Sequence, residues 1–303
     1  MNVKQKQERN LYKIGKWFKK VSKWKIVVDS GCDYYEWPTP HPEIDFVSVP
    51  LTIQVGERIF LDRHDLDIDE MMEVMYQTTE PAVSSCPSPQ AFKEAYEGAE
   101  QVIAITITGG LSGSHNAARL GKELLLDEHP QAQVHIIDSL SAGGEIDLLV
   151  AQLHRLMTQG LSFSEVVAAI TAFQERTKLL FVLSKIDNLV KNGRVNKLLG
   201  TVVGLLNIRM VGEASREGKL ELLHKPRGHK KSVQVAYDEL LKSGYQGGRI
   251  SISHRNNEKF CRDFSEKIRE NFPQTEITLL PTSGLCSFYG EEGGLLIGYE
   301  VGE

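Results

Sequence analysis

The chain has 303 residues, 41% hydrophobic and 25% charged, a balance that excludes disorder and fibres and leaves room for two globular domains. Its formal net charge of −5 offers no basic face to DNA or RNA, so no nucleic-acid partner is expected. The cysteines, at Cys32, Cys86, Cys261 and Cys286, form no C-x-x-C pair, which indicates free thiols in a reducing cytoplasm rather than zinc ligands or disulfides.

The first 23 residues form a basic arm. Lysines and Arg9 are spread along it, while Leu11, Ile14, Phe18 and Val21 recur at helical spacing. An amphipathic helix of this kind can bind transiently to an anionic membrane surface, and the alternative is an arm packed on its own domain or frayed in solvent. The lysines interrupt any signal-peptide core, and no apolar window reaches the length of about 18 residues that spans a membrane.

Residues 24–160 alternate between strand and helix patterns. Strands are expected at 25–30, at 44–55 as one or two strands, and at 101–108 and 133–139, with helices at 67–77, 88–99, 114–129 and roughly 144–159. Ser88-Pro89 is a good cap and first-turn pair for the second of these helices. Strands separated by helices of this length predict βαβ units and a parallel, Rossmann-like sheet.

Residues 161–303 predict a second α/β domain with a mixed sheet. Helices are expected at 162–177, 229–244 and 257–272, and a helical stretch at 185–207 is broken at Asn192-Gly193. Strands are expected at 178–184, 248–255 and 275–281, with a β-hairpin over 208–228 that turns at Glu217-Gly218. The remaining tail is rich in glycine and ends in a strand-like run.

Hydroxyl-bearing turns follow several of the expected strands. They are Asp29-Ser30, Ser84-Ser85, Thr108 to Ser114, and Asp138 to Ser141. Ligands of open α/β sheets bind outside the carboxyl ends of the strands, so these turns are expected to face one crevice.

Ser112 admits several interpretations. Gly110-Leu111-Ser112-Gly113-Ser114 matches the G-x-S-x-G nucleophile elbow except at its last position, and a serine hydrolase would need a base such as His135 or His254. Gly109, Gly110 and Gly113 could hold a phosphate at a helix start, although neither nucleotide-binding motif is present. The serine could also cap the helix, or hold a carboxylate without chemistry. Sequence pattern alone leaves these open.

A set of motifs resembles one family. They are "KIVVDSGCD" at the first strand, "SSCPSPQAF", "ITITGGLSGSHNAA", "HIIDSLSAGGE", "NLVKNGRV", "LLNIRMV" and "GKLELLHKPRGHKKS". In this order and spacing they resemble the DegV family of bacterial fatty-acid-binding proteins, which includes the FakB subunits of fatty acid kinase. The resemblance covers nearly the whole chain beyond the arm.

The resemblance implies a protein that is not itself an enzyme and needs no cofactor. It would bury one long-chain fatty acid and present the carboxylate to a separate kinase that makes acyl phosphate for phospholipid synthesis. By motif match, the carboxylate would be held by Ser84 or Ser85 and Ser112, with Arg194 near the head group. Residues expected in the vicinity are Asp29, Ser30, Thr108, Gly109, Gly110, Gly113, Ser114, Ser139 and Phe288, the last standing where the family has a histidine.

Overall fold

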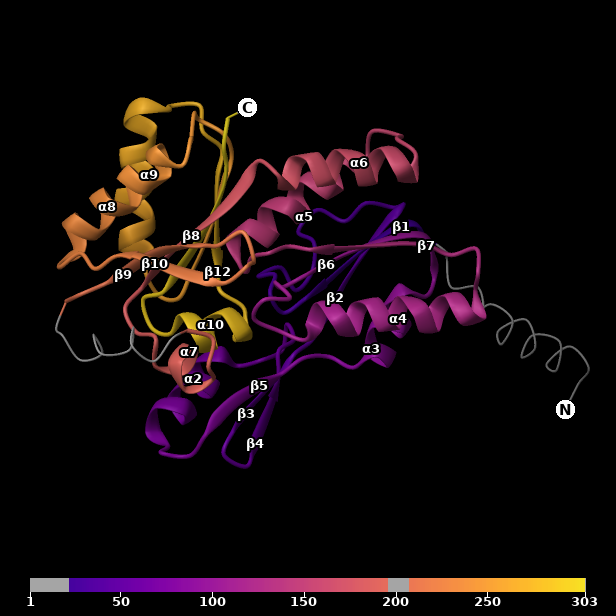
Figure 1. Cartoon of the computed structure of the whole chain (residues 1–303), viewed down its shortest axis with the longest axis horizontal. Helices are drawn as coiled ribbons and strands as arrows, with labels where there is room; N and C mark the ends of the chain where they lie inside the picture. Colours follow the sequence, from indigo (N-terminus) through magenta and orange to yellow (C-terminus); the bar gives the residue numbers. More distant parts are fainter. Residues whose placement is uncertain (1–21, 196–206, 303) are drawn as a thin grey trace, which may run out of the picture.

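The computed structural model describes residues 22–195 and 207–302 (Figure 1). The predicted basic arm, up to residue 21, and residues 196–206 of the predicted helical stretch lie outside the described residues. Strand β1 begins at Ser22. Across the described ranges, no helix is long and apolar enough to cross a membrane.

The first sheet has four parallel strands in the order β2-β1-β6-β7. Its strands are β1 (Ser22–Asp29), β2 (Ile44–Val49), β6 (Ala99–Thr106) and β7 (Gln133–Asp138). Helices α3 (Pro89–Tyr96) and α4 (Ser114–Glu128) pack on one face, and α5 (Gly144–Met157) and α6 (Phe163–Gln174) pack on the other. The prediction of a parallel, Rossmann-like half is confirmed, and Ser88 caps α3 by accepting from the Ala91 N–H at 3.2 Å.

The second sheet has six strands in the order β10-β9-β8-β13-β11-β12, and only β11 and β12 run parallel to each other. Its strands are β8 (Thr177–Leu183), β9 (Met210–Ala214), β10 (Leu220–His224), β11 (Ile250–His254), β12 (Ile277–Pro281) and β13 (Leu295–Glu300). Helices α8 (His229–Lys242) and α9 (Glu258–Asn271) cover one face. The predicted mixed sheet is confirmed, as is the hairpin, in which Gly218 has a φ of +68°.

A third, antiparallel sheet was not predicted. It contains β3 (Thr52–Val55), β4 (Arg58–Leu61) and β5 (Ala82–Ser85), and helix α2 (Ile68–Gln77) packs on it. Residues 44–55 are therefore two strands in different sheets. The break falls at Pro50, which has no N–H to continue a ladder. Two short helices, α7 (Asp187–Lys191) and α10 (Gly284–Gly290), complete the described elements, and α10 was also missed.

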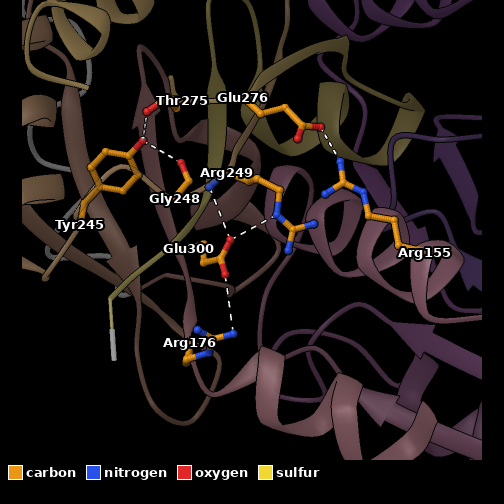
Figure 2. Close-up of polar contacts among 8 residues, drawn as sticks. All are labelled: Arg155, Arg176, Tyr245, Gly248, Arg249, Thr275, Glu276 and Glu300. Atoms are coloured by element: carbon orange, nitrogen blue, oxygen red, sulfur yellow. Dashed lines mark hydrogen bonds and ion pairs between the residues drawn. The ribbon is translucent and has the colours of Figure 1, made fainter. Parts of the chain in front are cut away.

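Helices α5 and α6 connect the two larger sheets. Helix α5 contacts β1 and β6 on one side and β13 and β11 on the other. Figure 2 shows the polar contacts in this region. Arg155 on α5 donates to Glu276, beside the mixed sheet, at 2.6 Å, and Arg249 donates to Glu300 within the mixed-sheet half at 3.2 Å. The Arg249 guanidinium also lies 4.8 Å from the ring centre of Phe173 on α6. Helix α6 follows residue 160 and packs on the first half. The division of the chain into domains at residue 160 stays a prediction.

Candidate functional site

A cavity of about 350 Å³ lies where the two halves meet. Its volume falls within the range of about 300–1,000 Å³ that is usual for small-molecule pockets. The cavity is enclosed by the loops after β5 and β6, one face of the mixed sheet, and helices α7 and α10. The residues that line it are Leu51, Ser84, Ser85, Cys86, Ile107, Leu111, Ser112, Gly113, Ala142, Leu179, Phe181, Leu183, Leu189, Arg194, Leu220, Leu285, Cys286, Tyr289, Gly290 and Leu296.

Strand β8 supplies the apolar wall of this pocket. Side chains alternate along a strand, so Leu179, Phe181 and Leu183 face the pocket, whereas Leu180 and Val182 join the core beneath α8 and α9. Both sets are buried, which explains why this strand reads as an unbroken apolar run. Eight other lining residues have aliphatic side chains, so much of the cavity wall is hydrocarbon.

Four hydroxyl-bearing side chains line the pocket, and contacts link the segments that carry them. We call this part of the lining the hydroxyl end, made by Ser84, Ser85, Ser112 and Tyr289. Ser84 Oγ and the Tyr289 hydroxyl are 2.9 Å apart. A Cβ at Gly113, next to Ser112, would lie 3.2 Å from the sulfur of Cys86, next to Ser85.

Ser112 lies in the turn before α4, and within the described residues its hydroxyl donates no hydrogen bond. Its N–H donates to the Thr108 carbonyl at 3.2 Å, and its Oγ accepts from the Ser114 N–H at 3.2 Å. Among the described residues no histidine is hydrogen-bonded to Ser112. His254 accepts instead from the Asn257 N–H at 3.2 Å, and His135, in β7, does not line the pocket. Within the described residues, Ser112 therefore has no hydrogen-bonded histidine of the kind that activates a serine nucleophile.

Arg194 reaches the same end from the loop after α7. Its Nε donates to the Leu111 carbonyl at 3.1 Å, and its Nη1 donates to the Asn192 carbonyl at 2.5 Å. Within the described residues it forms no ion pair with a carboxylate. The guanidinium of Arg194 is a group suited to binding an anion.

Asp29, Ser30 and Ser114 lie next to the pocket and do not line it. Asp29, at the end of β1, accepts from the N–H groups of Gly31 and Ile107 at 2.9 and 3.0 Å and from the Ser114 hydroxyl. It thereby ties β1 to the turn after β6. Burial raises the pKa of Asp29 to about 6, because desolvation of the carboxylate outweighs these hydrogen bonds. Ser30 Oγ accepts from the Leu51 N–H at 2.9 Å.

The remaining expected neighbours shape the turns around the pocket. Thr108 Oγ1 accepts from the Gly110 N–H at 3.0 Å, and the Gly109 N–H donates to Asp138 at 3.0 Å. A Cβ at Gly110 would lie 2.5 Å from the Glu217 carbonyl oxygen, so this glycine permits close approach to the β9–β10 turn. The N–H groups of Gly109 and Gly110 are thus already bonded to side chains of the protein. Ser139 lines a separate polar cavity.

Phe288 is buried outside the pocket lining, and its neighbour Tyr289 lines the pocket instead. The Phe288 ring packs among apolar side chains of the third sheet and α2. Sequence reasoning missed Tyr289 because helix α10 was not expected in a glycine-rich tail. Ser283 before the helix was a possible start signal, since serine is favoured there.

Two buried carboxylates from the first half hold the start of α10. Asp62 accepts from the N–H groups of Gly284 and Leu285 at 2.8 and 2.7 Å, and Asp33 accepts from the Ser283 N–H at 2.6 Å. Negative charge at a helix N-terminus is favourable. No local sequence pattern connects residues more than 200 positions apart, so these positioning groups were also missed.

The fold and the cavity together define a two-domain α/β protein with an apolar ligand pocket at the domain junction. The family model described as "Uncharacterised protein, DegV family" matches residues 23–300. A DegV domain-containing protein of Streptococcus pneumoniae is 66% identical over 278 residues, which are 92% of this chain and 99% of that protein. The chain belongs to the DegV family, as its motifs predicted.

Solved structures agree with this membership. The Streptococcus pneumoniae fatty acid kinase (Fak) B3 protein loaded with linoleic acid has a TM-score of 0.91 and 65% identity, covering 92% of this chain and all of that one. A DegV family protein from Eubacterium eligens loaded with heptadecanoic acid has a TM-score of 0.88 and 33% identity, with the same coverage. Both relatives carry a fatty acid.

Asp29→Asn should flatten the dependence of stability on pH. Because the folded-state pKa of about 6 lies above the ordinary 3.8, Asp29 contributes stability that is complete below pH 4 and is lost as pH rises through 6. The loss is roughly 3 kcal/mol, from about 1.4 kcal/mol per pKa unit. Asparagine stays neutral, so urea unfolding of the variant should lack this fall.

Asp127→Asn, on the exposed face of α4, is the matched control and should keep the wild-type slope. Parallel stability curves for the wild type and Asp29→Asn between pH 4 and 7 would contradict the assignment of this titration to Asp29.

Proposed function

We propose that the chain binds one long-chain fatty acid, with its hydrocarbon along β8 and its carboxylate at the hydroxyl end. The observation that carries this proposal is an apolar cavity lined also by Ser84, Ser112 and Arg194, which lie on segments that contact one another. Such a cavity matches a ligand with one long apolar part and one anionic head. The loaded relatives support the same ligand class.

The apolar wall supplies enough driving force for a lipid. Burying roughly a dozen methylene groups at about 0.8 kcal/mol each contributes on the order of 10 kcal/mol before opposing terms. Ordering of the acyl chain and loss of overall freedom reduce that gain. The balance still favours binding of a single chain.

Hydrogen-bond donors at the hydroxyl end would offset the free-energy cost of burying the head group. An ionised carboxylate is expensive to remove from water unless donors replace its hydration. Serine hydroxyls and a guanidinium provide such donors, and hydrogen bonds that involve a charged group are the stronger ones. The polar end therefore fixes the direction in which the fatty acid lies.

We propose a carrier role in preference to hydrolysis by Ser112. A serine nucleophile needs a base within hydrogen-bonding reach, and in the described part of the chain Ser112 Oγ is bonded only to the Ser114 N–H. An anion holder needs the free proton and no base. The carboxylate would leave the protein chemically unchanged.

We further propose that a separate ATP-dependent kinase in the cytoplasm phosphorylates the bound fatty acid. A carboxylate oxygen would attack the terminal phosphorus of ATP, giving acyl phosphate and ADP. The fatty acid kinase B3 relative supports this role. The product would enter phospholipid synthesis.

Native mass spectrometry of the purified protein should reveal one co-purified fatty acid, and the delipidated protein should bind labelled oleate. Ser112→Ala and Arg194→Gln should each weaken oleate binding about tenfold, because each removes one donor to a buried charge. Titration of labelled oleate into each variant measures this. Ser164→Ala, on the exposed start of α6, is the matched control.

An empty protein that also fails to bind oleate would overturn the lipid proposal. Covalent labelling of Ser112 by a fluorophosphonate, together with ester turnover, would favour the hydrolase instead.

The kinase step can be tested by trapping its product. Oleate-loaded protein, ATP and a fatty acid kinase catalytic subunit should yield oleoyl hydroxamate when hydroxylamine is present. Kinase with free oleate should yield little, because the carboxylate is then not oriented. Equal yields with and without this protein would contradict the presenting role.

The predicted basic arm is proposed to bind anionic membranes transiently. Deleting residues 1–21, which leaves β1 complete, should weaken sedimentation with phosphatidylglycerol vesicles, since each basic residue near such a surface contributes about 1 kcal/mol. Neutral phosphatidylcholine vesicles are the control. Unchanged sedimentation would favour an arm that packs on its own domain or stays in solvent.

A further inference from the structure

Tyr289 is a polar side chain of the pocket that no motif marked. Its hydroxyl lies 2.9 Å from Ser84 Oγ, and both residues line the cavity. Ser84 comes from β5 in the first half and Tyr289 from α10 near the C-terminus. The bond therefore joins two distant parts of the chain at the hydroxyl end.

The two pocket serines have the same pattern of hydrogen bonds within the described residues. Ser112 Oγ accepts from the Ser114 N–H, so its own proton is free. The Ser84–Tyr289 pair can bond in either direction. We assign Tyr289 as the donor because a phenol is more acidic than an alcohol, and this leaves the Ser84 proton for a ligand. Accepting one bond also polarises a hydroxyl and strengthens the bond that it donates. Both serines then face the pocket as donors.

The Tyr289 ring is held firmly enough to impose this direction. It packs against three of the hydrophobic clusters and meets the Phe288 ring at 4.8 Å in an edge-to-face contact. Helix α10 is anchored at its start by Asp62 and Asp33. A phenol so held loses little further freedom when a ligand binds.

We propose that Tyr289 is a positioning residue that makes Ser84 a dedicated donor, so that the hydroxyl end selects ionised fatty acids over fatty alcohols. The inference rests on the proposed fatty-acid site. A carboxylate only accepts hydrogen bonds and satisfies every donor there. An alcohol oxygen accepts from the same donors without a negative charge, so it gains less from them than a carboxylate does.

Tyr289→Phe in the full-length, delipidated chain tests the inference. Oleate affinity should fall about five- to tenfold, because a polarised donor to a charged group is lost, while oleyl alcohol affinity should fall by less than about twofold, because its oxygen is uncharged. The measured quantity is the ratio of the two dissociation constants. Tyr34→Phe is the matched control, since Tyr34 packs against Trp37 and does not line the pocket.

Ser84→Ala removes the same bond from its other partner and must show the same acid-specific loss. The double variant should bind oleate no more weakly than Ser84→Ala alone, because Tyr289 acts through Ser84. If Tyr289→Phe weakens oleate and oleyl alcohol equally, or weakens neither, the positioning role is overturned while the fatty-acid site stands. If the wild type binds no oleate, the proposed function itself fails.

Discussion

Strand β8 presents apolar side chains to both of its faces, and each face must be removed from water. Helices α8 and α9 cover the face that bears Leu180 and Val182 with an ordinary packed core. The face that bears Leu179, Phe181 and Leu183 is covered by loops of the first half together with α7 and α10. Loops and two short helices cover this face less completely than α8 and α9 cover the other, and a cavity of about 350 Å³ remains. The pocket thus follows from how the second face is covered.

The segments that cover the pocket face of β8 are held by contacts between residues far apart in the chain. Asp62 and Asp33 hold the first N–H groups of α10, and burial raises the pKa of both carboxyls. Gly110 allows the turn after β6 to meet the β9–β10 hairpin. Ser112 and Tyr289, from different halves, therefore line a single cavity. The polar chemistry of the site is therefore a product of the domain junction.

Sequence patterns predicted the regular elements well where each buries its own apolar stripe. The parallel strands and the helices that flank them show a hydrophobic period in the sequence, and the hairpin shows a glycine at its turn, Gly218. The third sheet and α10 were missed for a physical reason. Strands β4 and β5 have four residues each and α10 has seven, too short for a period to show, and tertiary contacts stabilise them.

The sequence by itself determined the fold class, the family and the serine-rich turns. Strand and helix periods and turn residues are local properties, so they can be read directly from the order of residues. Its motif match led to Ser84, Ser85, Ser112 and Arg194, which the structure brings to one pocket. Only the tertiary structure decided that Ser114 serves Asp29, that Phe288 lies in a core, and that Tyr289 bonds Ser84. Those roles depend on which side chains, distant in sequence, lie close enough in space to contact or hydrogen-bond each other. A sequence pattern does not contain the distances between such side chains.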